Sequence, residues 1–190
     1  MGPVSSASVD EVERAILSSD ESSPLLLYID SPGGSVFDGL DLVQTMQASG
    51  RRIICVANQA ISMAFYIFLA CDERYITPNA ILMQHVSSYA ISGEEPNNYT
   101  KSRLLRRVSK AMDHEQAKRL NMTYAEFRKK IRDDWWIFGT EAISVGAASG
   151  VRSVSCDRKL VSAKKTILVP VLFGSESRSV SACPLLQSDR

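Results

Sequence analysis

The sequence predicts an α/β protein with a parallel sheet built from repeated strand–helix–strand units. Two largely apolar runs, Leu25–Ile29 and Arg52–Ala57, have the length and continuity of strands buried in such a sheet. Between them, a glycine-containing turn leads into a helix that ends near Gly50. Helices that link successive strands in this way imply right-handed crossovers and parallel strand pairing.

The composition is that of a soluble globular chain with no strong attraction to nucleic acid or to membranes. The 190 residues include 22 basic and 21 acidic ones, so the net charge is only +1. Such a balance gives no long-range field for a polyanion or an acidic lipid surface. No apolar stretch has the length of a membrane span, and the N-terminus lacks the layout of a signal peptide.

The cysteines and the absent motifs narrow the chemistry further. Cys55, Cys71, Cys156 and Cys183 form no CxxC or similar pair. Cys55 and Cys71 lie in apolar surroundings and are expected to be reduced core thiols, which predicts a cytoplasmic protein. Dinucleotide and Walker phosphate motifs are absent, and no His, Cys or carboxylate cluster has metal-ligand spacing. We therefore expect neither a cofactor nor a metal.

The first half of the chain is predicted to alternate helices and strands. A helix is expected over Ser8–Ser18, where Ser8 can cap the helix and Glu11 completes a capping box. The strand Leu25–Ile29 then ends at Asp30–Ser35, and the helix after it precedes the second strand. The side chains predicted to face inward are those of Val9, Val12, Ala15 and Ile16 in the first helix and of Val36, Gly39, Leu40, Val43 and Met46 in the second.

The second half is predicted to be mixed and then helical. Two short strands, Glu73–Ile76 and Ala80–Gln84, are expected around the turn Thr77–Asn79. Further along, the sequence predicts a long helix over Tyr99–Leu120, a capped helix from Thr123, a short helix over Thr140–Val145 and a last strand over Val151–Val154.

The chain is predicted to form one domain over residues 1–157, followed by a C-terminal extension over 158–190. In the extension, Thr166–Phe173 has the composition of a strand, and Pro170 restricts it to a sheet edge. The segment Gly174–Arg190 is polar and serine-rich, and we expect it to be disordered.

Ser62 is the first candidate functional residue, because it lies where a buried strand ends and a buried helix begins. The apolar run Met63–Ala70 follows it directly and has the length of a core helix. The first amides of a helix lack intrahelical partners, so they can stabilise an anion formed at a serine placed there. The alternative is that Ser62 only caps the helix, since Ser is a favoured capping residue.

A nucleophilic serine needs a base, and the chain has only two histidines. His85 follows the strand Ala80–Gln84, and in an open α/β sheet the active site gathers at strand ends of this kind. His114 lies among charged residues within the long helix and is expected to be exposed. The alternative for His85 is a hydrogen-bonded histidine at a strand end with no role in chemistry.

A carboxylate and a glycine pair complete the candidate site. Asp133 and Asp134 precede Trp135–Trp136, which can shield a carboxylate from water, although both could instead end a helix in solvent. Gly33–Gly34 follows the first strand, and an amide there can act as one oxyanion donor beside the amide of Met63. An ordinary tight turn is the alternative for the glycines.

Five segments, in order, resemble the proteolytic subunits of the Clp protease, the ClpP family. The resemblance extends over about Leu25–Val154. The segments are Tyr28–Gly34, Thr45–Gln47, Gln59–Met63, Pro78–His85 and Arg132–Asp134, the last placed seven residues before Glu141.

This resemblance implies a serine endopeptidase with a ClpP/crotonase-like fold. It implies Ser62 as nucleophile, His85 as base and Asp134 as orienting acid, and a shift of one residue would exchange Asp134 for Asp133. The amides of Gly34 and Met63 correspond to the family's oxyanion hole. The long helix corresponds to a handle that packs two seven-membered rings face to face. The resemblance further implies a chamber in which unfolded polypeptides are cleaved, with an AAA+ unfoldase as partner.

Departures from the family pattern keep two other functions open. Asn58 and Ala64 stand where the family usually has Gly, and Gln84 and Val86 flank the histidine where Ile and Gln-Pro are common. These substitutions motivate a non-catalytic structural subunit of a mixed ring as an alternative. A crotonase-type acyl-CoA enzyme is the other alternative, and it gives Ser62 and His85 no required shared role.

Overall fold

The computed structural model describes residues 1–18, 23–171, 174–181 and 183. The chain forms two compact units, Met1–Arg152 and Ser153–Arg190. The first unit ends close to the boundary that the sequence predicts after residue 157.

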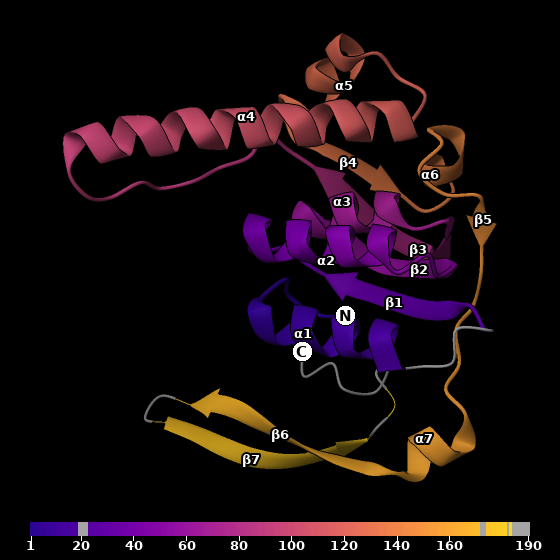
Figure 1. Cartoon of the computed structure of the whole chain (residues 1–190). Helices are drawn as coiled ribbons and strands as arrows, with labels where there is room; N and C mark the ends of the chain where they lie inside the picture. Colours follow the sequence, from indigo (N-terminus) through magenta and orange to yellow (C-terminus); the bar gives the residue numbers. More distant parts are fainter. Residues whose placement is uncertain (19–22, 172–173, 182, 184–190) are drawn as a thin grey trace. The chain divides into compact units, whose positions relative to one another are not determined.

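The first unit contains the sheet and six helices of the described chain (Figure 1). The helices are α1 (Ser6–Ser18), α2 (Val36–Ala48), α3 (Met63–Ala70), α4 (Glu95–Arg119), α5 (Tyr124–Ile131) and α6 (Glu141–Ser144). The strands are β1 (Leu25–Ser31), β2 (Ile53–Ile61), β3 (Glu73–Gln84), β4 (Trp135–Phe138) and β5 (Gly150–Val151).

The sheet has the strand order β1-β2-β3-β4, with β5 beside β3. Strands β1, β2 and β3 pair in parallel and are connected through α2 and α3, whereas β4 pairs antiparallel with β3. The predicted α/β class with a mainly parallel sheet is thereby confirmed. Strand β4 was not predicted, because four residues between two helices carry too little pattern to identify a strand.

Helix α3 is the centre of the core. Every residue from Met63 to Leu69 is buried, and the helix contacts α2, α4 and the three parallel strands. A helix that is apolar on all sides has to be enclosed in this way. The predicted core helix after Ser62 is therefore present, and its N-terminus is fixed relative to the sheet.

Several local predictions were wrong for identifiable reasons. The two short strands predicted on either side of Thr77–Asn79 are one continuous strand, β3. Its pairing with β2 shifts at this point, so Thr77–Ala80 form a bulge opposite Asn58 that accommodates Pro78. Leu26, expected to be buried, is 57% exposed because β1 buries only the face that carries Leu27 and Ile29, and Leu26 points to the other face. In α1, Ser8 lies inside the helix and its hydroxyl donates to Pro3 O at 2.7 Å, so it is no N-cap.

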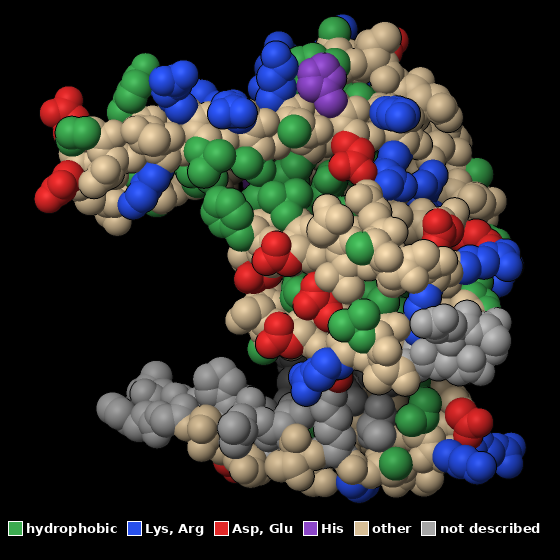
Figure 2. Space-filling view, viewed as in Figure 1, with side chains coloured by type: hydrophobic (Ala, Val, Ile, Leu, Met, Phe, Trp, Pro, Cys, Tyr) green, Lys and Arg blue, Asp and Glu red, His purple; other side chains and the backbone are tan. Residues whose placement is uncertain are grey.

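The predicted handle helix is present as α4, which begins at Glu95 and so before the expected Tyr99. Its buried residues all lie in its C-terminal half, whereas Tyr99 and Leu104 in the N-terminal half are exposed. Figure 1 shows this N-terminal half extending beyond the sheet, and Figure 2 shows Lys and Arg side chains along the helix. Helix α5 begins with the predicted capping box between Thr123 and Glu126.

The cysteines form two disulfides, Cys55–Cys71 and Cys156–Cys183. This corrects the expectation of reduced thiols, which failed because residues 16 apart in sequence meet where the chain turns from β2 through α3. Disulfides persist mainly in oxidising compartments. The cytoplasmic location therefore loses one of its premises and stays a prediction. Among the described residues, no helix combines the length and the apolar character needed to cross a membrane.

The second unit contains α7 (Arg158–Ser162) and the antiparallel hairpin of β6 (Lys164–Val171) and β7 (Gly174–Ser181). The expected edge strand is thus present as β6, with β7 as its partner. Strand β7 lies where disorder was expected, because hairpin pairing can order a polar segment whose composition alone does not predict a strand. Residues 182 and 184–190 of the expected disordered tail lie outside the described residues.

Candidate active site

Ser62 lies at a sharp turn between β2 and α3. Its backbone has φ 57° and ψ −120°, a conformation that costs a non-glycine residue about 1–3 kcal/mol. The turn is held by a hydrogen bond from the Ser62 amide to Met83 O at 2.8 Å. Ser62 is the N-cap residue of α3 by position, but its hydroxyl accepts no hydrogen bond from the helix, so its side chain does not cap α3. A strained strand-to-helix turn is also the place where α/β-hydrolases expose a nucleophilic serine.

His85 follows the last residue of β3 and meets Ser62 directly. Its Nε2 atom lies 2.7 Å from the Ser62 Oγ, and the imidazole is half-buried. In a neutral imidazole whose Nε2 accepts a hydrogen bond from the Ser62 hydroxyl, the ring proton is on Nδ1. The second histidine, His114, is exposed as expected and stacks on Tyr124 with ring centroids 4.1 Å apart.

Two residues that line the same cavity as Ser62, Gly34 and Met63, have backbone amides that could serve as oxyanion donors. The segment Gly33–Ser35 pairs with Val4, through Val4 N to Gly33 O at 2.8 Å and Ser35 N to Val4 O at 2.9 Å. This pairing leaves the Gly34 amide on the opposite side of the segment. Met63 is the first residue of α3, so its amide has no intrahelical acceptor. Across the described ranges, neither amide donates to another protein group.

Glycines bring these backbones close together. At Gly33 (φ 91°), a Cβ would lie 2.6 Å from Ile61 O and 2.9 Å from Ser62 Cβ, so only glycine fits beside the turn. In α2, a side chain at Gly39 would overlap the side chain of Met63. The two glycines therefore let the segment after β1 and helix α2 approach the start of α3.

The carboxylates make no hydrogen bond to His85 among the described contacts. Gln84 pairs with Trp135 at the end of β3 and the start of β4, so His85 and Asp134 each lie one residue outside this last paired position. Asp134 has φ 52°, is exposed, and makes no hydrogen bond to His85 among the described contacts. Asp133 forms an exposed ion pair with Arg132 at 2.9 Å.

The expected shielding by the tryptophans is wrong. Trp135 packs in the core against Phe65 and Phe127, whereas Trp136 is 54% exposed. Successive side chains of a strand point to opposite faces, so the two rings cannot cover the same carboxylate.

A cavity of about 110 Å³ lies beside the Ser62–His85 pair. Its wall combines apolar side chains from α2, α3 and α4 with polar groups from the loop after β3. The lining residues are Gly34, Val36, Ser62, Met63, Gln84, His85, Ser87, Ser88, Met112 and Gln116. Among the described residues, no group of three or more His, Cys, Asp or Glu is placed to hold a metal.

Asn58, one of the departures from the family pattern, has a structural role. Its Nδ2 donates to Asp30 Oδ1 at 3.2 Å, and its Oδ1 accepts from Thr77 Oγ1 at 2.9 Å. The side chain thereby links β1, β2 and β3 at the point where the β2–β3 register skips. A glycine could not make these bonds.

Sequence reasoning did not assign a role to the buried pair Gln84 and Gln116. Gln84 is 5% exposed and Gln116 is 2% exposed, and the Gln84 amide donates to Gln116 Oε1. The available signal was a glutamine on the inward stripe of α4, four residues after Met112.

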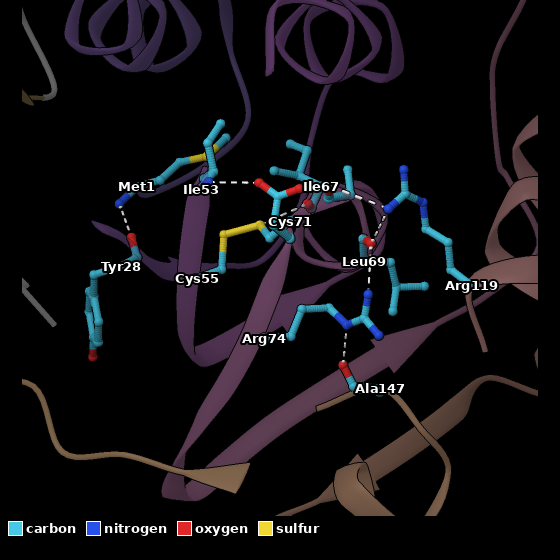
Figure 3. Close-up of a disulfide and its surroundings, with 12 residues drawn as sticks. Met1, Tyr28, Ile53, Cys55, Ile67, Leu69, Cys71, Arg74, Arg119 and Ala147 are labelled. Carbon is cyan, nitrogen blue, oxygen red and sulfur yellow. Dashed lines mark hydrogen bonds between the residues drawn. A yellow bond between two sulfur atoms is a disulfide. The ribbon is translucent and has the colours of Figure 1, made fainter. Parts of the chain in front are cut away.

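The C-terminal end of α3 is tied to its surroundings by side chains (Figure 3). Leu69 O accepts from Arg119 Nη1 at 3.1 Å and from Arg74 Nη1 at 3.3 Å, and Ala70 O accepts from Arg119 Nη1 at 3.4 Å. The disulfide from Cys71 to Cys55 joins this end to β2.

Comparison with known proteins places the chain in a family. A family model described as Clp protease matches residues 3–154. The ATP-dependent Clp protease proteolytic subunit 2 of Tropheryma whipplei (strain Twist) is 27% identical over 137 residues, or 70% of this chain and 76% of that protein.

Two further relatives agree. The ATP-dependent Clp protease proteolytic subunit 1 of Leifsonia xyli subsp. xyli (strain CTCB07) is 28% identical over 136 residues, covering 70% of this chain and 69% of that protein. Subunit 3 of Synechococcus sp. (strain CC9902) is 27% identical over 140 residues, covering 72% and 70%. These matches confirm the resemblance seen in the sequence, and the chain belongs to the Clp protease family.

Proposed function

We propose that this chain is a serine endopeptidase that cleaves unfolded polypeptides. The Ser62 Oγ attacks the scissile carbonyl while His85 Nε2 takes the hydroxyl proton. The amides of Gly34 and Met63 donate to the oxyanion. His85 then gives the proton to the leaving amine, and water hydrolyses the acyl-enzyme by the same steps, which frees the Ser62 hydroxyl.

The observation that carries this proposal is the 2.7 Å approach of His85 Nε2 to the Ser62 Oγ at a strained turn. Strained backbone conformations are retained where the surrounding structure fixes them, and they cluster at active sites. The hydroxyl therefore already lies within proton-transfer distance of its base, and the same cavity is lined by Gly34 and Met63, whose amides have no acceptor among the described residues.

Asp134 is the proposed orienting acid. Its position supports this role, because His85 and Asp134 each lie one residue outside the last paired position, Gln84 with Trp135, of β3 and β4. Asp133 is the less favoured residue because its carboxylate is engaged by Arg132. Catalytic hydrogen bonds often tighten only when substrate is bound.

The relatives' names supply the larger context. All three are proteolytic subunits of ATP-dependent Clp proteases. We propose that this chain likewise assembles into rings, expected as stacked heptamers, and receives polypeptides from an AAA+ unfoldase. The exposed N-terminal half of α4, with Tyr99 and Leu104 on its surface, supports a role in assembly. The substrate is proposed to bind extended, as an added strand.

Active-site labelling tests the proposal. The assembled full-length protein is treated with a fluorophosphonate probe, and hydrolysis of a short fluorogenic peptide is followed in parallel. We expect Ser62 to be labelled, and we expect Ser62→Ala to lose both labelling and hydrolysis. A wild-type protein that is assembled but neither labelled nor active would contradict the proposal.

The non-catalytic alternative is favoured by one observation, namely that Asp134 does not contact His85. Paired variants decide between the two functions. If Asp134 orients the base, Asp134→Asn lowers turnover by about 10⁴-fold while Asp133→Asn retains it. If the subunit is purely structural, hydrolysis by the chain alone is absent and neither variant changes it.

The acyl-CoA alternative has less support than the peptidase. It gives the Ser62–His85 hydrogen bond no required role, whereas the peptidase mechanism uses it. Acyl-CoA turnover that survives Ser62→Ala would nevertheless establish it.

A further inference from the structure

A buried pair of glutamines connects α4 to the Ser62–His85 pair. Gln84 is the last residue of β3, and Gln116 lies in the buried half of α4. The Gln84 Nε2 donates to Gln116 Oε1, and Gln116 Nε2 donates to Met112 O of its own helix at 3.3 Å. The second amide is therefore fixed on α4 and holds the first.

Gln84 also contacts the backbone of both proposed catalytic residues. Its Nε2 donates to Ser62 O at 3.4 Å, and its Oε1 accepts from the His85 amide at 3.0 Å. One side chain thus bridges the carbonyl group of the nucleophile and the amide group of the base. These backbone groups belong to the same two residues whose side chains make the 2.7 Å contact.

Stability alone does not explain why a polar pair occupies this position. Burial of an amide has an unfavourable free energy that its hydrogen bonds only offset. Replacing both buried partners by apolar groups of similar shape is often neutral or stabilising.

The directional bonds of the pair do have a local use. Ser62 holds a backbone conformation that a non-glycine residue avoids, and its neighbours have to keep it there. A hydrocarbon contact resists compression but does not fix the direction of a carbonyl group. The Ser62 carbonyl group accepts from the Phe65 and Tyr66 amides of α3 at 3.0 and 3.3 Å, and Gln84 adds a further restraint on its direction while it also holds the His85 amide.

We propose that Gln84 and Gln116 are positioning residues that hold the Ser62 hydroxyl and the His85 imidazole in register. This inference rests on the proposed serine peptidase function. Neither glutamine is a catalytic residue, since Gln84 binds backbone groups and Gln116 acts through Gln84. The hydrogen-bond chain makes the C-terminal half of α4 part of the support of the active site.

A double substitution separates positioning from structure. Gln84→Met and Gln116→Met are made singly and together in the full-length chain, because Met matches Gln in length but does not donate hydrogen bonds. The exposed Gln44 in α2 provides the matched control, Gln44→Met. Each variant is measured for its urea midpoint and for the second-order rate and pH profile of fluorophosphonate labelling at Ser62.

We expect each single variant to lower the urea midpoint, because it leaves the other amide buried without its partner. The double variant should recover most of that loss, yet its labelling should stay about 10- to 100-fold slower than wild type. Its pH profile should also shift, because the His85–Ser62 contact is less constrained. Gln44→Met should behave as wild type.

Other outcomes would overturn specific claims. Wild-type labelling by a folded double variant would show that the pair is only structural. If the double variant does not fold, Gln116→Met decides, because it retains the Gln84 contacts and removes only their tether; labelling of that variant at the wild-type rate would also refute the inference. A wild-type protein that is not labelled at Ser62 would instead refute the serine peptidase itself.

Discussion

The two ends of α3 differ in the partners that their backbone groups have. At its N-terminus, Ser62 is strained and the Met63 amide has no acceptor within the described chain. At its C-terminus, the carbonyl groups of Leu69 and Ala70 accept from arginines, and the disulfide begins at Cys71 (Figure 3). The helix is anchored away from the proposed chemistry, so the amide at the reactive end remains available to a substrate.

Charge follows the same division. The C-terminus of a helix carries partial negative charge, and both Arg74 and Arg119 bind it. Burial, with a smaller contribution from Arg119, lowers the pKa of Arg74. The N-terminus has the complementary partial positive charge and no acidic side chain in its first turn. Such an end is suited to a transient oxyanion.

The largest expected effect comes from the reactive end. Ser62→Gly should lower turnover by about a millionfold. The same change should stabilise the fold by about 1 kcal/mol relative to Ser62→Ala, because glycine adopts the Ser62 conformation without strain. Urea unfolding of the two variants measures the difference. Equal midpoints would indicate that the turn carries no strain.

The next effect is expected at the anchored end. Removal of the disulfide by Cys55→Ala with Cys71→Ala should lower the free energy of unfolding by about 3 kcal/mol, the value for a loop of this length. Urea unfolding without reductant measures it. Cys156→Ala with Cys183→Ala is the control, since that disulfide lies in the other unit. An unfolding free energy of the wild type that dithiothreitol does not change would show that the Cys55–Cys71 disulfide does not stabilise the fold.

A smaller loss is expected for Arg119→Met. The substitution leaves the Ala70 carbonyl group without its arginine partner and weakens the binding of Leu69 O, with an expected cost of about 1–3 kcal/mol. The exposed Arg107, at the middle of α4, is the matched control, and Arg107→Met should change stability by less than about 0.5 kcal/mol. Similar losses in both variants would disprove a specific anchor.

The smallest effect is expected in the middle of α3, where Tyr66 donates to Glu115 Oε2 at 2.5 Å. Burial raises the pKa of Tyr66, and the bond to Glu115 raises it further. The phenol therefore contributes stability that is complete below an unfolded pKa of about 10 and falls as pH rises above it.

Tyr66→Phe tests this contribution. The variant should be less stable by about 1 kcal/mol at pH 8 and should lose less stability than wild type between pH 8 and 10.5. Urea unfolding across that interval provides the comparison. Parallel pH profiles for the two proteins would exclude Tyr66 as the source of the alkaline loss.

The sequence was sufficient to predict those site residues whose position depends only on the strand that they follow. Ser62 and His85 each follow a strand of a parallel sheet, and the carboxyl ends of such strands share an edge. Asp134 was harder to predict, since β4 is short and antiparallel and carboxylates are common in the chain. Its role as an acid stays a prediction, as does the choice between it and Asp133.

The disulfides and the glutamine pair were missed for a different reason. Cys55 and Cys71 meet only after β2, the turn and α3 are folded, so their spacing in the sequence carries no signal. Gln84 and Gln116 lie on different elements, and each alone is a polar residue on an otherwise apolar face. The pairing of Gln84 with Gln116 can be recognised only when the packing of β3 against α4 is known.

Gly39 in α2 leaves space for the side chain of Met63, and this has a consequence for directed evolution. Gly39 does not line the cavity beside Ser62, yet a larger side chain there would overlap the side chain of Met63, whose amide is one of the two proposed oxyanion donors. A library randomised at this codon and selected for hydrolysis should return glycine almost alone. A selection for folding should tolerate more residues there, because α2 can shift outward when the spacing to α3 no longer matters.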